Sequence, residues 1–319
     1  MTHAVGGGKV LIKRWLLRLC CSAVLALPAA AGEVEHAIMV RPAQIFLSPD
    51  SSSTKLGDID RGREVAILEK SRNWLHVLAS VSPERDLTGW IVDKGVVRAS
   101  TPDGDKIMFG EGARCELEAS RRGGRRGAAD EARRLYYRTS EYFPSSPLAG
   151  EGLYRAADIQ WQLDAADVRT RPSSKARDPG LHIQIDEQFM KMVIQKFPGT
   201  KWSDLASYHL IENKLCGEWE GLSKCPEKES ELYEKYGEDH PDSPAAAEAF
   251  YNAAWRQSTL IEIYKSENKT NKIEGARSKA KALAQRVIEK YPQSDWAYRS
   301  KSLVYMIDQQ IPTYGNAVE

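Results

Sequence analysis

The sequence holds few residues of the kinds that mark catalytic or metal sites. Its six histidines form no His-x-x-x-His pair, and its five cysteines form no Cys-x-x-Cys pair. The glycine-rich run Gly6–Lys9 lacks the spacing of a phosphate-binding loop. These absences exclude the common zinc motifs and the P-loop class of nucleotide sites. We therefore expect no enzyme, no cofactor and no metal site.

Long apolar runs and a strong net charge are also missing. The apolar run Leu19–Leu27 is shorter than the roughly 20 residues that a membrane helix needs. Residues 1–31 hold four of the 45 basic residues and no acidic residue, so the rest of the chain has a net charge near −3. Such a charge favours neither nucleic acid nor anionic lipid. We expect no nucleic-acid partner.

The first residues have the pattern of a secretory signal peptide, residues 1–31. A basic stretch ends at Arg18, the apolar run follows, and Pro28 precedes the small residues Ala29–Ala31. An uncleaved anchor is the alternative. With cleavage, the protein is not integral to a membrane, and we expect it to be periplasmic or otherwise extracytoplasmic.

Three cysteines follow the expected signal. In an oxidising compartment Cys216 and Cys225 are candidates for a disulfide, because Gly217 and Gly221 between them interrupt a helix. Two separate buried thiols are the alternative. Cys115 lies in a helical pattern on an apolar face, where a buried thiol is favoured over a hydrolase nucleophile.

Residues 36–99 have the pattern of a compact, six-stranded β-barrel, which a linker at 100–104 follows. Short apolar runs alternate with turn residues there. The expected strands are Ala37–Val40, Ile45–Leu47, Glu64–Glu69, Trp74–Ala79, Gly89–Val92 and Val96–Val97.

Three motifs in this region carry a resemblance to bacterial SH3-like domains. They are Leu56–Gly62 (LGDIDRG), Asn73–Val77 (NWLHV) and Thr88–Val92 (TGWIV). The resemblance implies a small barrel and allows recognition of cell-wall material. Trp74 and Trp90 are the candidate ligand-binding residues, as a stacking face for a peptide or a glycan. Alternatively they plug the barrel, a role that we favour for at least one of them.

Residues 105–312 have helical periodicity and an internal repeat, with a tail at 313–319. The repeat is anchored on four prolines. A hydroxyl residue follows each proline by two positions, and small residues follow by five and by eight. The four prolines are Pro144, Pro198, Pro241 and Pro292.

Each proline is expected to end a helix, and the hydroxyl to cap the next one. The small residues then allow close packing between helices that stack in pairs. The pattern is similar to tetratricopeptide repeats, in particular those of the outer-membrane β-barrel assembly lipoprotein and of periplasmic division coordinators. The repeats are longer than 34 residues, which predicts insertions at Arg169–Gly180 and Ser266–Lys272.

The fold class expected is therefore a small all-β SH3-like barrel followed by an all-α tetratricopeptide-like array. We expect an extracytoplasmic scaffold that binds an envelope protein or peptide through its helices. The alternatives are a peptidoglycan-binding module built on the barrel, and a cell-wall hydrolase with Cys115 as nucleophile. The basic run Arg121–Gly127 is interpreted as a solvated turn in preference to a site for an acidic polymer.

Overall fold

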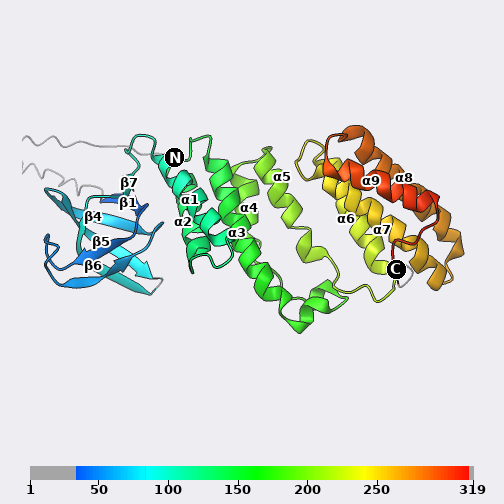
Figure 1. Cartoon of the computed structure of the whole chain (residues 1–319), viewed down its shortest axis with the longest axis horizontal. Helices are drawn as coiled ribbons and strands as arrows, with labels where there is room; N and C mark the ends of the chain where they lie inside the picture. Colours follow the sequence, from blue (N-terminus) through cyan, green and yellow to red (C-terminus); the bar gives the residue numbers. More distant parts are fainter. Residues whose placement is uncertain (1–33, 83, 316–319) are drawn as a thin grey trace, which may run out of the picture. The chain divides into compact units, whose positions relative to one another are not determined.

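The computed structural model describes residues 34–82 and 84–315, and the expected signal peptide lies outside them. An antiparallel seven-stranded sheet comes first and a series of α-helices follows (Figure 1). The strands are β1 Glu35–Met39, β2 Ala43–Phe46, β3 Lys55–Ile59, β4 Glu64–Ser71, β5 Trp74–Ser82, β6 Arg85–Val92 and β7 Val96–Arg98.

The sheet is not closed. Its strand order is β3-β2-β6-β5-β4-β1-β7, so β3 and β7 are its two edges within the described residues. Six strands were expected from the sequence and lie where they were predicted, whereas β3 was not expected. Lys55–Ile59 pairs with β2 although Gly57 interrupts its apolar pattern.

Buried and exposed side chains alternate along the strands, so one face of the sheet contributes to a hydrophobic core. In β5 the side chains of Leu75, Val77 and Ala79 are fully buried, and Trp74 and His76, which alternate with them, are partly exposed. The buried face packs with residues of the other strands, such as Ile45 and Ile91. Trp74 and His76 therefore lie on the opposite face, away from this core.

Nine α-helices lie within the described residues. They are α1 Gly104–Ser120, α2 Ala128–Tyr142, α3 Ala149–Arg169, α4 Gln188–Lys196, α5 Lys201–His209, α6 Lys224–Asp239, α7 Ala246–Ser266, α8 Thr270–Lys290 and α9 Asp295–Asp308. Each anchor proline stands two residues after the end of a helix, namely α2, α4, α6 and α8. The prediction that these prolines end helices is confirmed.

The four hydroxyl residues divide into two kinds of cap. The Oγ1 atom of Thr200 accepts from the backbone N–H of Ser203 at the start of α5, and Ser294 caps α9 in the same way. Ser146 and Ser243 instead accept from the amide two residues on, in a tight turn before α3 and α7. The cap prediction is therefore correct for two helices, and in the other two a turn that contains a proline comes first.

Small residues allow the helices to approach closely, as the repeat predicted. Ala149, Ala246 and Ala249 are fully buried. A Cβ atom on Gly152 would lie 2.8 Å from the carbonyl oxygen of Tyr136 in α2, closer than real contacts allow. The α2–α3 packing therefore depends on the lack of a side chain at this position.

Consecutive helices pack on one another from α1 to α5 and again from α6 to α9. Between α5 and α6 the chain runs through residues 210–223, which include the short 3-10 helix η3 (Glu212–Lys214). The predicted insertion at Arg169–Gly180 is confirmed and includes two 3-10 helices, η1 (Pro172–Lys175) and η2 (Pro179–Leu181). The one predicted at Ser266–Lys272 is wrong, because only three residues separate α7 from α8 there.

The sheet shares a hydrophobic core with the first helices. Ile38 and Val97 of the sheet belong to the same buried cluster as Met108, Leu135 and Tyr136 of α1 and α2. Residues on both sides of residues 100–104, the predicted linker, are therefore packed together.

The turn between β3 and β4 strengthens this junction. Gly62 has a φ of +74°, and a Cβ atom there would lie 2.5 Å from the Cβ atom of Arg134. The Arg61 guanidinium bonds to Glu131 at 3.1 Å, and both side chains are largely buried. Glycine is required here both for the backbone angle and for the close contact with α2.

Cys115 and the basic loop Arg121–Gly127 both contact Glu131 at this junction. Cys115 is fully buried, with its Sγ atom 3.7 Å from a Glu131 oxygen, and burial raises the pKa of its thiol. In the loop, Arg125 bonds to both Glu118 and Glu131. The basic run is thus not purely a solvated turn, because one of its arginines pairs with a buried carboxylate.

Candidate functional site

A pocket of about 240 Å³ lies where the α3–α4 insertion meets the segment between α5 and α6. Its walls come from the end of α3, from η1, from the extended residues 182–185 and from η3 with the residues after it. The lining residues are Ala165, Val168, Arg169, Ser174, His182, Ile183, Gln184, Ile185, Glu212, Asn213, Leu215 and Cys216.

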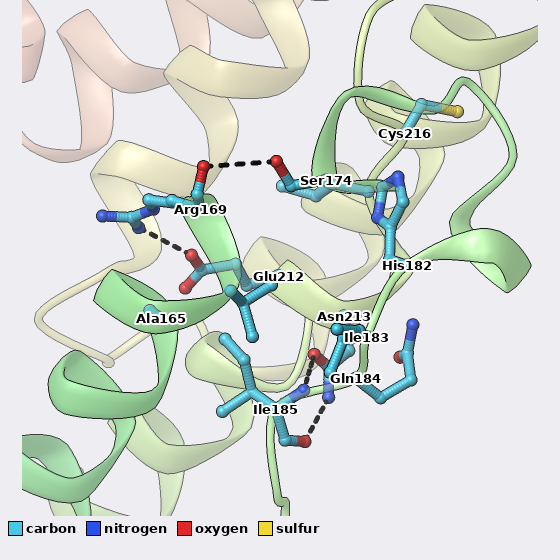
Figure 2. A pocket seen from close by; sticks show the side chains of 12 residues that line it. Ala165, Arg169, Ser174, His182, Ile183, Gln184, Ile185, Glu212, Asn213 and Cys216 are labelled. Atoms are coloured by element: carbon cyan, nitrogen blue, oxygen red, sulfur yellow. Dashed lines mark hydrogen bonds and ion pairs between the residues drawn. The ribbon is translucent and has the colours of Figure 1, made fainter. Parts of the chain in front are cut away.

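Hydrogen bonds hold the pocket walls together, as Figure 2 shows. The side-chain amide of Asn213 accepts from the N–H of Ile185 at 3.1 Å and donates to its carbonyl at 2.9 Å, as a neighbouring strand would. Arg169 donates to Glu212 at 2.8 Å (Figure 2). The other oxygen of Glu212 accepts from Trp161 at 2.8 Å. Three distant segments are therefore fixed around one cavity.

Two polar side chains of the pocket bond to backbone carbonyls. The hydroxyl of Ser174 donates to the carbonyl of Arg171 at 2.8 Å. His182 bonds through Nε2 to the carbonyl of Ala176 at 2.7 Å, which requires that nitrogen to carry the proton. Within the described residues, no hydrogen bond joins this hydroxyl to the imidazole. The geometry suits binding of a mixed apolar and polar group.

One pocket wall presents unused backbone groups and exposed apolar side chains. Ile183, which lines the pocket, is 51% exposed, and Leu181, two residues before it, is 65% exposed. Among the described residues none bonds to the backbone N–H groups of Ile183 and Gln184. An extended peptide can use such groups in the manner of an added strand.

The disulfide predicted between Cys216 and Cys225 is present, and it adjoins this pocket. The Cα atoms of the two residues are 6.0 Å apart. The N–H of Gly217 donates to the carbonyl of Ala176 at 3.1 Å, and Glu218 donates to Lys175 at 3.2 Å. The disulfide-bonded loop therefore holds the α3–α4 insertion in place.

The predicted aromatic residues Trp74 and Trp90 lie on the sheet, outside the pocket. Trp90 stacks on His76 with ring centroids 4.8 Å apart, and Trp74 packs edge-on against Phe46 at 5.8 Å. The two pairs adjoin, since Phe46 is the register partner of Trp90. They form an aromatic face opposite the sheet core.

Of the pocket residues, only Cys216 was among the predicted sites, as a disulfide partner, although the sequence placed an insertion at Arg169–Gly180. No protein-family model matches the sequence, and the search of curated proteins finds no match. No group of three or more metal-ligating side chains is found within residues 34–82 and 84–315. None of the described helices is long and apolar enough to span a membrane.

Proposed function

We propose that the protein is an extracytoplasmic adaptor that binds an envelope protein or peptide and catalyses no reaction. The helices would form a tetratricopeptide-like array, and the sheet an SH3-like module packed against it. The disulfide supports an oxidising compartment. The proline-anchored repeat, with its buried small residues, supports the array.

The pocket at the α3–α4 insertion carries the proposal. Ile185 and Val168 supply apolar surface, Arg169 and Asn213 supply polar groups, and the exposed Ile183 stands at the rim. Sites of this composition take an apolar side chain while polar groups fix its backbone. We propose that an extended partner segment lies along residues 181–185 and inserts one side chain.

Site-specific photocross-linking in the full-length protein tests this proposal. A photoreactive residue at Ile183 should capture one defined partner in the native envelope. The same residue at Leu68, a 49%-exposed position on β4, is the matched control. Equal products at both positions, or none at Ile183, would argue against a binding site at the pocket.

A pair of substitutions measures the same interaction with the captured partner. Ile183→Asp should weaken binding by more than tenfold, because it loses apolar burial and desolvates a charge. Leu68→Asp should leave binding unchanged. A similar effect of both substitutions would point to a general loss of solubility or charge balance.

The aromatic face of the sheet favours a second candidate function, binding of cell-wall glycan. Trp74, His76 and Trp90 are partly exposed together, and stacked rings bind sugars and peptides well. Retention of the full chain on purified peptidoglycan, lost in Trp90→Ala, is the expected result. The full chain is used because Ile38 and Val97 are buried against the helices. A full chain that is not retained would rule this candidate out.

A further inference from the structure

A second cavity, of about 210 Å³, lies beside the disulfide and has a cationic wall. It is lined by Arg177, Asp178, Pro179, Cys216, Lys224, Cys225 and Lys228. Arg177 pairs with Glu220 at 3.3 Å, and Asp178 is the one acid in the lining. Within the described residues, no carboxylate lies within ion-pair distance of Lys224 or Lys228. The cavity is therefore open to an anion that approaches the disulfide.

The two sulfur atoms of the disulfide are not equivalent. Cys216 is partly exposed in a loop, whereas Cys225 is 5% exposed and is the second residue of α6. A thiolate at a helix N-terminus is stabilised by the backbone N–H groups and by nearby cations. The carbonyl of Arg177, 3.8 Å from the Cys225 sulfur, acts in the opposite direction. Lys224 and Lys228 line the same cavity as Cys225 and act in the same direction as the helix N-terminus.

We propose that the Cys216–Cys225 disulfide is exchangeable and that this cavity admits a small anionic thiol. The thiolate sulfur attacks the Sγ atom of Cys216 and forms a mixed disulfide with it. The Cys216–Cys225 bond breaks, and its electron pair leaves on the Cys225 sulfur. A low-pKa leaving thiol makes such a step faster.

A second molecule of the same thiol completes the reduction. Its thiolate attacks the thiol-derived sulfur of the mixed disulfide and releases Cys216 as a thiolate. The products are the dithiol protein and one small-molecule disulfide. Two electrons pass from the two thiols to the protein, and no further oxidant or reductant is required.

The test measures the reduction of the native full-length protein by thiols of equal size and different charge. The probes are 3-mercaptopropionate, 2-mercaptoethanol and cysteamine, and released protein thiols are counted by maleimide mass shift. Rates are divided by the thiolate concentration of each probe and by its rate with a small uncharged disulfide, because the nucleophilicity of a thiolate rises with its pKa. The anionic thiol should react faster than the cationic one. The ratio of their rates should fall in 0.5 M salt, because the Debye length is then about 4 Å and the lysine charges are screened.

Substitutions then assign the preference to this cavity. Lys224→Gln and Lys228→Gln should each lower the anion-to-cation rate ratio by about twofold to threefold. Lys235→Gln removes the same charge farther along α6, where Lys235 pairs with Asp239, and should leave the ratio unchanged. Equal ratios in all four proteins would overturn the proposal. So would a disulfide that no thiol reduces until the chain is unfolded.

Discussion

Replacing Glu131 by glutamine should destabilise the junction between the sheet and the helices by about 3 kcal/mol. The Arg61 and Glu131 side chains are only 12% and 5% exposed, and they lie 3.1 Å apart. Removing one partner of a buried pair typically costs about 3–5 kcal/mol, because the other charge stays buried. Because glutamine retains some of the hydrogen bonds, we expect the loss of stability to lie at the lower end of this range. The measurement is hydrogen exchange of residues 104–142, together with the denaturation midpoint.

The control for this prediction is a pair that is more exposed. Glu118 bonds to Arg125 at 3.1 Å, with side chains 30% and 40% exposed, so Glu118→Gln should cost at most about 1 kcal/mol. The double variant Arg61→Met, Glu131→Met should cost less than Glu131→Gln alone, because it leaves no unpaired charge at position 61 and Arg125 keeps its bond to Glu118. Equal losses for Glu131→Gln and Glu118→Gln would refute the reasoning from burial.

Three further predictions concern pH, packing and the disulfide. Burial raises the pKa of Glu131, but Arg125 and Arg61 together bring it below the ordinary value of 4.5. Its contribution to stability should therefore be present at neutral pH and be lost as the pH falls below 4.5 toward the lower folded-state pKa, in wild type but not in Glu131→Gln. Ala149→Leu and Ala246→Leu should each overpack a helix pair and lower the free energy of unfolding by about 1–3 kcal/mol, and an unchanged melting temperature for both would contradict the repeat register. Cys225→Ser should cost about 2–3 kcal/mol by loop entropy and speed hydrogen exchange in residues 172–187, with Cys115→Ser as the comparison that should not affect that segment.

Local rules predicted the helix boundaries because each depends on a few neighbouring residues. A proline such as Pro241 ends a helix wherever it stands, and a hydroxyl such as Thr200 satisfies amides of its own chain. The disulfide was also predictable, since Cys216 and Cys225 are close in sequence and separated by glycines. In these cases the relevant energy is set within about ten residues.

The failures concern lengths and distant contacts. The spacing of 51 residues between Pro241 and Pro292 gives no indication whether the additional residues form a loop or lengthen two helices, and the structure has two helices of 21 residues. Likewise Gly62 is, in the sequence, only the last residue of the motif Leu56–Gly62. Its contact with Arg134, more than 70 positions away, follows only from the packing of the sheet on α2.

The place of the pocket follows from how the helices are joined. Where consecutive helices pack directly, their apolar surfaces cover each other and leave no space for a ligand. Between α5 and α6 the backbones approach less closely, and side chains connect the two helices, such as Tyr208 and Tyr236 with ring centroids 5.1 Å apart. The loop that holds the disulfide bonds to the α3–α4 insertion beside this junction. A covalent bond contributes most where few helix contacts hold the chain, and in the α3–α4 insertion that this loop supports the side chain of Ile183 stays exposed.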